Sequence, residues 1–397
     1  MKDLTCIIIG GGYAGLAALK AIKKKFRGME KKGRRIRFVL IDKQPGHLRK
    51  LRLFRPTTAE EEIMIPWKQL LLEGFEFVQG TVTSVNSRGK RIRYTNAIGN
   101  EARICYDLLV VAVGSTVRRL NAEQGGIALI EPQAAEDIRE HWRTNLRKAV
   151  DERDPEERKR LMTITVAGAG ISGIETSAEL ALAMRKEAAT LRLNSADISV
   201  YLLNAQERLP PEGGEKVGRK LGQKLSQCGV TVLHNRKAMR EETGIVMLNN
   251  GDYLAAGLCI WTIGLMPNPV LQGMGLPLTT EGQVLVDECY RVQGMPDVYS
   301  IGDCARIIDP RTDKADQMTC LEAGMQGIRL GKIVMADLED RPAPIHKSVK
   351  SNMDYFNIGL GQNGFFWIRK WGLDMTMTGK VPGKIKNLVE DYASMLR

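Results

Sequence analysis

Two short glycine clusters have the spacing that a chain needs to bind the pyrophosphate of a dinucleotide. The first, Gly10–Gly15, and the second, Gly168–Gly173, each follow a short apolar run and open a helical pattern. In this G-x-G-x-x-G pattern the first glycine permits a tight turn, the second lets a phosphate approach the backbone, and the third lets strand and helix pack closely. One copy is weak evidence, but two copies with the correct flanks predict two nucleotide sites.

The strands that follow the two clusters end differently. The run Ile36–Asp42 is a predicted buried strand ending in an acid, where a carboxylate is expected to bind the ribose hydroxyls of adenosine. The run Ile198–Asn204 ends in an amide, which can accept a bond from a ribose hydroxyl and does not repel a 2′-phosphate. Arg208 follows closely and is either a phosphate contact or an ordinary surface residue. The pattern therefore favours NADH over NADPH only slightly.

The composition is that of a globular protein with anionic partners. The 397 residues suffice for two or three domains, and a net charge of +12 with 6% aromatic residues favours a phosphate-bearing cofactor or an acidic membrane over nucleic acid. Seven cysteines without close pairs favour a reducing, cytosolic-side location, and four scattered histidines suggest no metal site. No apolar run reaches the roughly 18 residues that span a bilayer, and the glycine cluster explains the apolar N-terminus better than a signal peptide does.

Strands and helices predicted around the clusters place the two sites in separate α/β units. The basic segment His47–Pro56 is expected either along a cofactor or at the surface, and the basic run 20–37 is expected to be a solvated loop. The other predicted elements, in chain order, are an antiparallel insertion over 75–106, a buried strand over 108–115, a charged helical stretch over 133–160, a second small sheet over 230–264, a strand over 297–305 and a helix over about 318–338.

Together these motifs resemble the type II NADH dehydrogenases and apoptosis-inducing-factor-like quinone reductases, which are flavoproteins with two dinucleotide-binding domains. The resemblance covers nearly the whole chain. It rests on the two glycine clusters, Asp42, Ala112-Val113-Gly114, Asp154-Pro155, Ile174-Glu175 and Val298–Asp303. It implies an α/β fold of two Rossmann-like domains, each with a small antiparallel insertion, plus a C-terminal membrane-associating segment. The implied limits are 1–118 and 283–343 for FAD, 119–282 for NAD(P)H, and 344–397 for the C-terminal segment.

The resemblance also assigns cofactors to the two sites. The implied FAD contacts are Gly10, Gly12, Tyr13, Ala14, Gly15, Asp42, Lys43, Val82, Ala112, Gly114, Gly302 and Asp303. The implied NAD(P)H contacts are Gly168, Gly170, Ile171, Ser172, Gly173, Asn204 and Gly264. Asp303 would bind the ribityl chain, or alternatively cap a helix. Glu175 would be the catalytic residue beside nicotinamide and flavin, or alternatively an acid stabilised by the helix dipole.

The acceptor side departs from the family. An Ala-Gln-x-Ala-x-Gln pattern near the family's quinone reads Cys320–Met325 here, with Leu321 and Met325 at the glutamine positions. These two residues share a helix face and, with Met318, are candidates for an apolar quinone tunnel or for the core. The implied reaction is hydride transfer from NADH to FAD and two-electron reduction of a quinone, menaquinone or ubiquinone, in a respiratory chain without proton pumping.

Two alternatives to this reaction remain open. A sulfide:quinone oxidoreductase shares the fold, but only Cys320 is suitably placed for its chemistry. A slow-turnover redox sensor that binds FAD and NADH is the other alternative. Dithiol reductases of the superfamily are excluded, because their chemistry needs two adjacent thiols.

The C-terminal segment has the composition of an interfacial surface. Residues 364–371 combine aromatic and cationic side chains, and the net charge from Pro344 onward is +4. Apolar residues recur at helical spacing beside Lys384 and Lys386: Ile385, Leu388, Val389, Tyr392 and Leu396. The alternative is a helix packed on the protein's own core or on a partner in a homodimer. The resemblance implies monotopic membrane attachment, which favours peripheral binding to the cytoplasmic side of a membrane.

Overall fold

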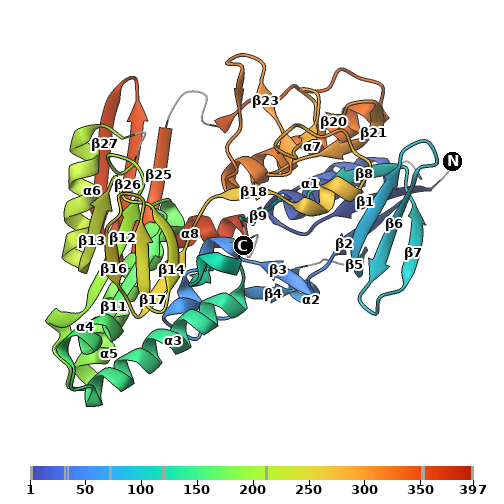
Figure 1. Cartoon of the computed structure of the whole chain (residues 1–397). Helices are drawn as coiled ribbons and strands as arrows, with labels where there is room; N and C mark the ends of the chain where they lie inside the picture. The colour runs from blue at the N-terminus through green and yellow to red at the C-terminus, as the bar shows by residue number, and fades with distance from the viewer. Residues whose placement is uncertain are drawn as a thin grey trace.

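The computed structural model describes residues 3–30, 33, 35–70, 74–118, 122–210, 213–349 and 354–394; Leu396 of the predicted C-terminal helix lies outside them. Two sheets with parallel centres organise the chain (Figure 1). The larger has eight strands in the order β20-β21-β8-β1-β2-β5-β6-β7, and the smaller has five in the order β10-β17-β11-β12-β13. The predicted α/β class with two Rossmann-like units is confirmed.

The eight-stranded sheet is parallel around β1 and becomes antiparallel at one edge. Its strands are β1 (Leu4–Ile9), β2 (Ile36–Asp42), β5 (Phe75–Asn86), β6 (Arg91–Asn96), β7 (Glu101–Cys105), β8 (Leu108–Val111), β20 (Arg291–Val292) and β21 (Met295–Ser300). The first half of β5 pairs in parallel with β2, and its second half pairs antiparallel with β6. The predicted antiparallel insertion over 75–106 is therefore confirmed, and its first strand also extends the parallel sheet.

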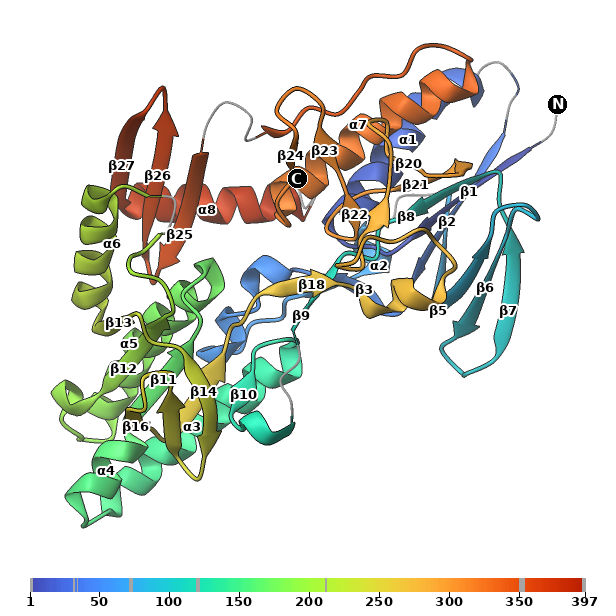
Figure 2. The same cartoon turned by 45° about the horizontal axis from the view of Figure 1, so that its top comes forward.

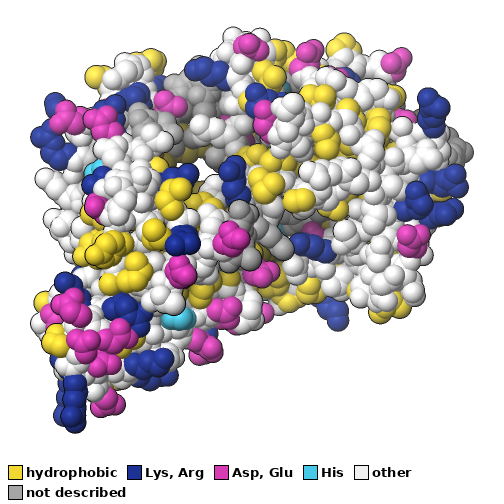
Figure 3. Space-filling model, in the orientation of Figure 1, with side chains coloured by type: hydrophobic (Ala, Val, Ile, Leu, Met, Phe, Trp, Pro, Cys, Tyr) yellow, Lys and Arg dark blue, Asp and Glu magenta, His cyan; other side chains and the backbone are white. Residues whose placement is uncertain are grey.

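Helices α1 (Tyr13–Glu30) and α7 (Cys320–Leu338) lie side by side over one face of this sheet (Figures 1 and 2). Glycines permit the close approach, because a Cβ at Gly327 would come within 2.7 Å of α1 and one at Gly331 within 2.8 Å. The basic run predicted as a loop is helical as far as Glu30, so that prediction is wrong. Lys and Arg side chains gather at the edge near the N-terminus (Figure 3).

The five-stranded sheet is parallel throughout and has its own antiparallel insertion. Its strands are β10 (Ile127–Ala128), β11 (Thr163–Ala167), β12 (Ser199–Asn204), β13 (Val230–His234) and β17 (Leu258–Trp261), and the insertion is β14 (Ala238–Glu242), β15 (Ile245–Leu248) and β16 (Tyr253–Ala255). The surrounding helices are α3 (Pro132–Asp151), α4 (Pro155–Leu161), α5 (Ile171–Thr190) and α6 (Glu215–Cys228).

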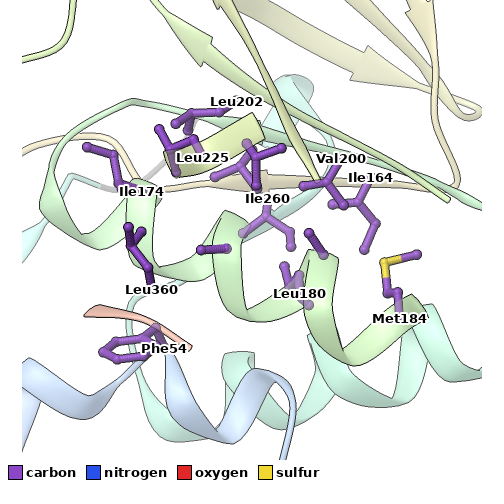
Figure 4. Packing of buried hydrophobic residues seen from close by; sticks show 14 of the residues in the cluster. Phe54, Ile164, Ile174, Leu180, Met184, Val200, Leu202, Leu225, Ile260 and Leu360 are labelled. Atoms are coloured by element: carbon purple, nitrogen blue, oxygen red, sulfur yellow. The ribbon is translucent and has the colours of Figure 1, made fainter. Parts of the chain in front are cut away.

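The core of this second unit lies between its sheet and α5 (Figure 4). Strand residues Ile164, Val200 and Ile260 face Leu180 and Met184 of the helix. Side chains from distant segments close the same cluster, among them Phe54 and Leu360. The C-terminal segment and the segment after β2 are therefore packed against the second unit.

The C-terminal segment is a three-stranded antiparallel sheet followed by a helix. It comprises β25 (Asp354–Leu360), β26 (Asn363–Lys370), β27 (Leu373–Gly379) and α8 (Lys380–Ala393). The interfacial interpretation of residues 364–371 is wrong for Phe365 and Trp367, which are 0% and 1% exposed and belong to the core. Alternate side chains of a strand face opposite sides, which the aromatic composition alone does not reveal. Trp371, in the following turn, is 86% exposed.

The remaining short elements connect these bodies. They are β3 (Gly46–Leu48), η1 (Lys50–Arg52), η2 (Arg55–Thr57), β4 (Met64–Pro66), α2 (Trp67–Leu70), β9 (Ser115–Val117), η3 (Ala122–Gln124), η4 (Ser195–Asp197), β18 (Leu265–Pro267), η5 (Pro269–Gly273), β19 (Val284–Leu285), β22 (Ala305–Arg306), β23 (Ile308–Asp309) and β24 (Lys314–Ala315). Strands β9 and β18 pair antiparallel where the chain crosses between the two units. In the described part of the chain, none of the helices has the length and apolarity needed to cross a bilayer.

Candidate active site

The first glycine turn joins β1 to α1 with the close contacts of a dinucleotide site. Gly10 has φ +97°, and a Cβ there would overlap the carbonyl oxygen of Ala112. A Cβ at Gly15 would overlap the carbonyl oxygen of Gly10. At Gly12, by contrast, no described atom lies within 4 Å of the Cβ position. Packing thus requires the first and third glycines. The open space beside the second glycine, at the N-terminus of the helix, fits a pyrophosphate, and we call such a space a cradle.

Asp42 is held against this turn by backbone N–H groups. Its Oδ2 accepts a hydrogen bond from the N–H of Gly11 at 2.6 Å, and its Oδ1 accepts from the N–H of Gln44 at 2.8 Å. Burial raises the pKa of Asp42, opposed by these two bonds and by the charges of Lys43 and Lys50. Because a carboxylate has about four acceptor sites, Asp42 still has capacity for ribose hydroxyls.

Asp303 lies beyond β21 in a turn, and the next helix of the chain begins only at Cys320. The helix-cap alternative for Asp303 is therefore wrong. Its Oδ2 accepts a hydrogen bond from Ser115 Oγ at 2.5 Å. Burial raises the pKa of Asp303, whereas the Ser115 hydroxyl and the charge of Lys50 lower it. This carboxylate is positioned beside the open turn at Gly114, where no described atom lies within 4 Å of the place that a Cβ would occupy.

Two residues of the basic segment after β2, which the sequence did not assign to a site, lie close to the first glycine turn and to these carboxylates. The exposed Lys50 donates from Nζ to the carbonyl oxygen of Ser115 at 2.7 Å and interacts electrostatically with both Asp303 and Asp42. His47 Nδ1 lies 2.9 Å from the carbonyl oxygen of Gly11, and its Nε2 is buried without a partner among the described residues. An unsatisfied buried nitrogen of this kind fits a ligand site.

Other predicted FAD contacts have different surroundings. Ala14 and Ala112 are buried at the turn, and Gly302 packs against Ala14, whose Cβ a side chain at Gly302 would meet at 2.9 Å. Lys43 is exposed, and its carbonyl oxygen accepts from Gln79. The Val82 side chain is 2% exposed and belongs to a core cluster, so only its backbone could contact a cofactor, and the predicted contact stays a prediction.

The second glycine turn repeats the geometry of the first between β11 and α5. Gly168 has φ +114°, and a Cβ there would lie 2.7 Å from the carbonyl oxygen of Thr262. A Cβ at Gly173 would overlap the carbonyl oxygen of Gly168. Gly170 and Gly264 face open space, with no described atom within 4 Å of either Cβ position. Ile171 and Ser172, at the start of α5, are exposed beside this opening.

Asn204 ends β12 but is occupied by its own turn. Its Nδ2 donates to the carbonyl oxygens of Gln206 at 2.9 Å and Arg208 at 3.0 Å and lies 2.9 Å from His234 Nδ1. Its Oδ1 accepts from the N–H of Gln206 at 3.2 Å, and the residue is 4% exposed. This geometry supports a role of Asn204 in organising the turn. The predicted ribose contact stays a prediction, for which one lone pair of Oδ1 is left.

Glu175 of α5 is buried in an ion pair with the C-terminal helix. Its Oε1 lies 2.5 Å from Nζ of Lys386 and accepts from the N–H of Gly359 at 2.7 Å. Burial raises the pKa of Glu175, and the charge of Lys386 is the largest influence that lowers it. The sequence indicated no partner for Lys386, which is 8% exposed in the structure. The helix dipole alone does not account for the charge of Glu175, because Lys386 of α8 also stabilises it.

Helix α8 is held to the segment after β2 by further ion pairs. Arg49 and Arg52 lie 2.5 and 2.9 Å from Asp391, and Arg52 lies 2.9 Å from Glu390. The Glu390 side chain is 2% exposed. The outward face of the helix is apolar instead, and its exposed residues are Val381, Ile385, Leu388, Val389 and Tyr392. The helix therefore turns Lys386 and Glu390 inward and exposes a hydrophobic face.

In the acceptor-side segment, Cys320 lies within electrostatic range of both Tyr13 of α1 and Lys386 of α8. Charges on Cys320 and Glu390 both influence the pKa of Tyr13, which burial raises. Burial also raises the pKa of the Cys320 thiol to about 11, opposed by the charge of Lys386. Leu321 and Met318 are half-buried, whereas Met325 is 38% exposed and so is not a core residue. Groups of His, Cys, Asp and Glu that could hold a metal ion are absent from the described residues.

Comparison with known proteins finds relatives of this chain among the NADH dehydrogenases. A probable NADH dehydrogenase of Dictyostelium discoideum is 26% identical over 241 residues, which are 59% of this chain and 53% of that protein. A type II NADH:quinone oxidoreductase of Haemophilus influenzae is 25% identical over 355 residues, which are 80% of this chain and 78% of that protein. The chain thus spans about half the length of the first relative and most of the second.

Solved structures share the fold. The structure of NDH2 from Plasmodium falciparum in complex with NADH has a TM-score of 0.82 at 17% identity and is matched over 100% of this chain and 97% of that one. A sulfide:quinone oxidoreductase from Aquifex aeolicus has a TM-score of 0.74 at 14% identity, with 98% and 90% of the two chains covered. The family model described as pyridine nucleotide-disulphide oxidoreductase matches residues 4–327. The chain belongs to the pyridine nucleotide-disulphide oxidoreductase family.

Proposed function

We propose that this protein is an FAD-dependent NADH dehydrogenase that reduces a quinone at a membrane surface. The observation that supports the proposal most is the pair of equivalent cradles: Gly12 and Gly170 each face open space at a strand–helix turn that its neighbouring glycines pack closely. Two such cradles in one chain suit two dinucleotides. The relatives named as NADH dehydrogenases and quinone oxidoreductases supply the direction of electron flow.

The first cradle is the FAD site in this proposal. The turn at Gly12 would hold the pyrophosphate, Asp42 the adenosine ribose and Asp303 the ribityl chain, with the exposed Lys50 between the two carboxylates as the nearby cation. FAD, when bound, supplies the two-electron chemistry that connects a nicotinamide donor with a quinone acceptor. The protein's part is binding, orientation and charge.

The second cradle is the nicotinamide site. The N-terminal turn of α5 directs its backbone N–H groups and the positive end of the helix toward the open space at Gly170, which suits a pyrophosphate. Glu175 lies one turn further along α5, and its ion pair with Lys386 joins this site to the C-terminal helix. We propose that the acid positions the nicotinamide end of the ligand.

Quinone, as menaquinone or ubiquinone, is the proposed acceptor. Leu321 and Met325 replace the family's glutamines on α7 and, with Met318, offer an apolar and partly exposed wall near Cys320. This part of the proposal rests on the named activity of relatives and on that wall. The sulfide alternative has no observation in its favour beyond a shared fold, because Cys320 is a single thiol with a raised pKa.

An anionic membrane surface is the proposed partner of the C-terminal segment. The exposed apolar face of α8 is accompanied on β27 by Leu373, Met375 and Met377, which alternate along the strand and are 70%, 62% and 39% exposed. Exposed Lys380 and Lys384 flank that face of the helix. An apolar stripe bordered by cations suits a monotopic association with the cytoplasmic side of a membrane, and a homodimer is the competing occupant.

Stopped-flow spectroscopy tests the enzymatic proposal. The purified yellow protein is mixed with NADH, and bleaching of the flavin band is expected; a second mixing with menaquinone or ubiquinone analogues should restore the band. Sulfide in place of NADH is the control and should leave the band unchanged. Bleaching without recovery by any quinone analogue would contradict quinone reduction, and a long-lived charge-transfer band with slow recovery would favour a redox sensor.

A further inference from the structure

The end of the second strand in each unit occupies the same structural position. The N–H of Gly10 donates to the carbonyl oxygen of Ile41 at 2.8 Å, and the N–H of Gly168 donates to that of Leu203 at 3.2 Å. The next residue after each acceptor is Asp42 in the first unit and Asn204 in the second. In dinucleotide-binding domains a residue at this position faces the adenosine ribose, and an acid there selects an unphosphorylated ribose.

The two residues at this position share one contact and differ in the others. Each accepts from the N–H two residues further on, Gln44 for Asp42 and Gln206 for Asn204. Asp42 also accepts from Gly11 of its own glycine turn, whereas Asn204 donates into the loop that follows β12, to Gln206 and Arg208. The ribose position of the second unit thus has a neutral side chain engaged elsewhere, so the acid that would repel a 2′-phosphate is missing from it.

The backbones of two arginines are hydrogen-bonded to Asn204. The carbonyl oxygen of Arg208 accepts from Asn204 Nδ2 at 3.0 Å, and the N–H of Arg236 donates to the carbonyl oxygen of Asn204 at 3.0 Å. The Arg208 side chain is exposed and makes no ion pair with a described residue. Arg236 is 3.8 Å from Asp252, and both side chains are substantially exposed, so this surface pair holds the guanidinium only weakly.

The other charges around this loop leave a positive surplus. Lys237 lies beside Arg236 and is exposed, and Glu207 is the one acid within residues 204–208. Glu207 is three residues beyond the strand end, and Asp252 is the acid already near Arg236. An arginine fork binds a phosphate with two charge-assisted bonds, which a neutral ribose hydroxyl cannot match.

From these contacts we propose that the second site accepts NADPH as well as NADH, and that Arg208 and Arg236 bind the 2′-phosphate. The inference rests on the proposed assignment of this site to a nicotinamide dinucleotide. It adds a substrate and two specificity-determining residues to that assignment. The mild preference for NADH that the strand sequence indicates is replaced by acceptance of both coenzymes.

Equilibrium binding to fragments of the two coenzymes tests the inference without turnover. The FAD-loaded protein is titrated calorimetrically with 2′,5′-ADP and with 5′-ADP. The native chain should bind 2′,5′-ADP at least as tightly as 5′-ADP. Arg208→Ala and Arg236→Ala should each weaken 2′,5′-ADP about tenfold, the size expected for losing one charge-assisted contact, while 5′-ADP changes less than about twofold.

An acid restored at the ribose position gives the reciprocal test. Asn204→Glu should weaken 2′,5′-ADP about tenfold or more and retain 5′-ADP. Arg219→Ala is the matched control, since Arg219 is an exposed arginine on α6 paired with Glu215; it should change neither affinity. Circular dichroism of each variant establishes that the fold is intact.

Two results would overturn the inference. One is a native chain that binds 2′,5′-ADP ten times more weakly than 5′-ADP. The other is an equal loss of both ligands in the arginine variants, which indicates a structural role. Failure of quinone reduction with intact 2′,5′-ADP binding would contradict the proposed enzyme activity and leave the 2′-phosphate contact standing.

Discussion

Lys386 of α8 lies 2.5 Å from Glu175 of α5, so the C-terminal helix neutralises an acid in the first turns after the second glycine cluster. Both side chains are at least nine-tenths buried, and Glu390 extends the pair at 3.4 Å from the same ammonium. The two ends of the ion pair are 211 residues apart (386 − 175) in the sequence. The helix that follows the second glycine cluster and the exposed apolar helix are therefore joined by a buried ion pair.

Removal of Lys386 should destabilise the fold. Lys386→Met leaves Glu175 buried without its cation, and we expect the free energy of unfolding to fall by about 3 kcal/mol, the usual cost of breaking a buried pair. Urea denaturation of the FAD-loaded protein measures the change. The double variant Glu175→Gln/Lys386→Met should recover much of the loss, because no unpaired charge remains. Lys384→Met, at an exposed position of the same helix, is the control; an equal loss in both lysine variants would contradict the pairing.

The same variant should alter the pH dependence of stability. Burial raises the pKa of Glu175 above its ordinary value of 4.5, and Lys386 opposes that rise. A raised carboxyl pKa contributes stability that is present below the ordinary pKa and is lost as pH rises through the folded-state pKa. Without Lys386 the folded-state pKa rises further. We therefore expect the stability difference between Lys386→Met and the native chain to be small near pH 4.5 and to increase toward neutrality, as urea midpoints across pH would show.

The glycine cradles predict opposite outcomes for two neighbouring substitutions. Gly15→Ala places a methyl group on the carbonyl oxygen of Gly10, so we expect the variant to lose several kcal/mol of stability or not to fold. Gly12→Ala meets no described atom within 4 Å and should fold normally, but its methyl group enters the proposed pyrophosphate cradle. Its FAD affinity should fall, as fluorescence titration of the apoprotein measures. Unchanged FAD binding in folded Gly12→Ala would place the cofactor elsewhere.

The sequence predicted the two strand–turn–helix units because glycine spacing is a local property. Gly10, Gly12 and Gly15 follow one another within a single turn, and the second cluster repeats them. The strand that precedes Gly302-Asp303 was equally recognisable, although it ends at Ser300 and not in the predicted range to 305. The turn after it, which excludes the helix-cap alternative, required the structure.

Long-range contacts were beyond local patterns. In the sequence, Lys386 lies among the polar residues of an amphipathic helix. Its partner Glu175 lies in a different unit, and Lys386 is buried only because α8 packs against that unit. Lys50 lies in a basic run whose position was open. The residues that it approaches, Ser115 and Asp303, lie 65 and 253 residues further along the chain, so no local pattern could indicate them.

Lys50 should contribute to FAD affinity. Its ammonium is the cation that interacts with both Asp42 and Asp303, and the proposed cofactor brings a pyrophosphate to the neighbouring glycine turn. Lys50→Met should weaken FAD binding to the apoprotein about tenfold and make that binding less sensitive to salt, because one phosphate-directed charge is lost. Lys68→Met, an exposed lysine of α2, is the control. Equal FAD affinity at low salt would remove Lys50 from the site.

The exposed apolar face of α8 should determine attachment to membranes. Leu388 and Val389 are 48% and 46% exposed, whereas Lys386 and Glu390 of the same helix face inward, so replacing the two apolar residues leaves the buried ion pairs in place. Burial of such side chains in a bilayer interface contributes up to about 1.5–3 kcal/mol each. The double variant Leu388→Ser/Val389→Ser should therefore bind vesicles of phosphatidylglycerol and phosphatidylcholine at least about tenfold more weakly in a sedimentation assay.

Two comparisons separate the membrane from the competing occupant. Ile98→Ser is the matched control, because Ile98 is 80% exposed in the turn between β6 and β7, far along the chain from α8, and should leave vesicle binding unchanged. Vesicles of phosphatidylcholine alone should bind the native chain more weakly, since Lys380 and Lys384 then lack anionic headgroups. If the double variant instead binds vesicles normally but changes from dimer to monomer in sedimentation velocity, the face is a homodimer interface, and the membrane assignment is wrong.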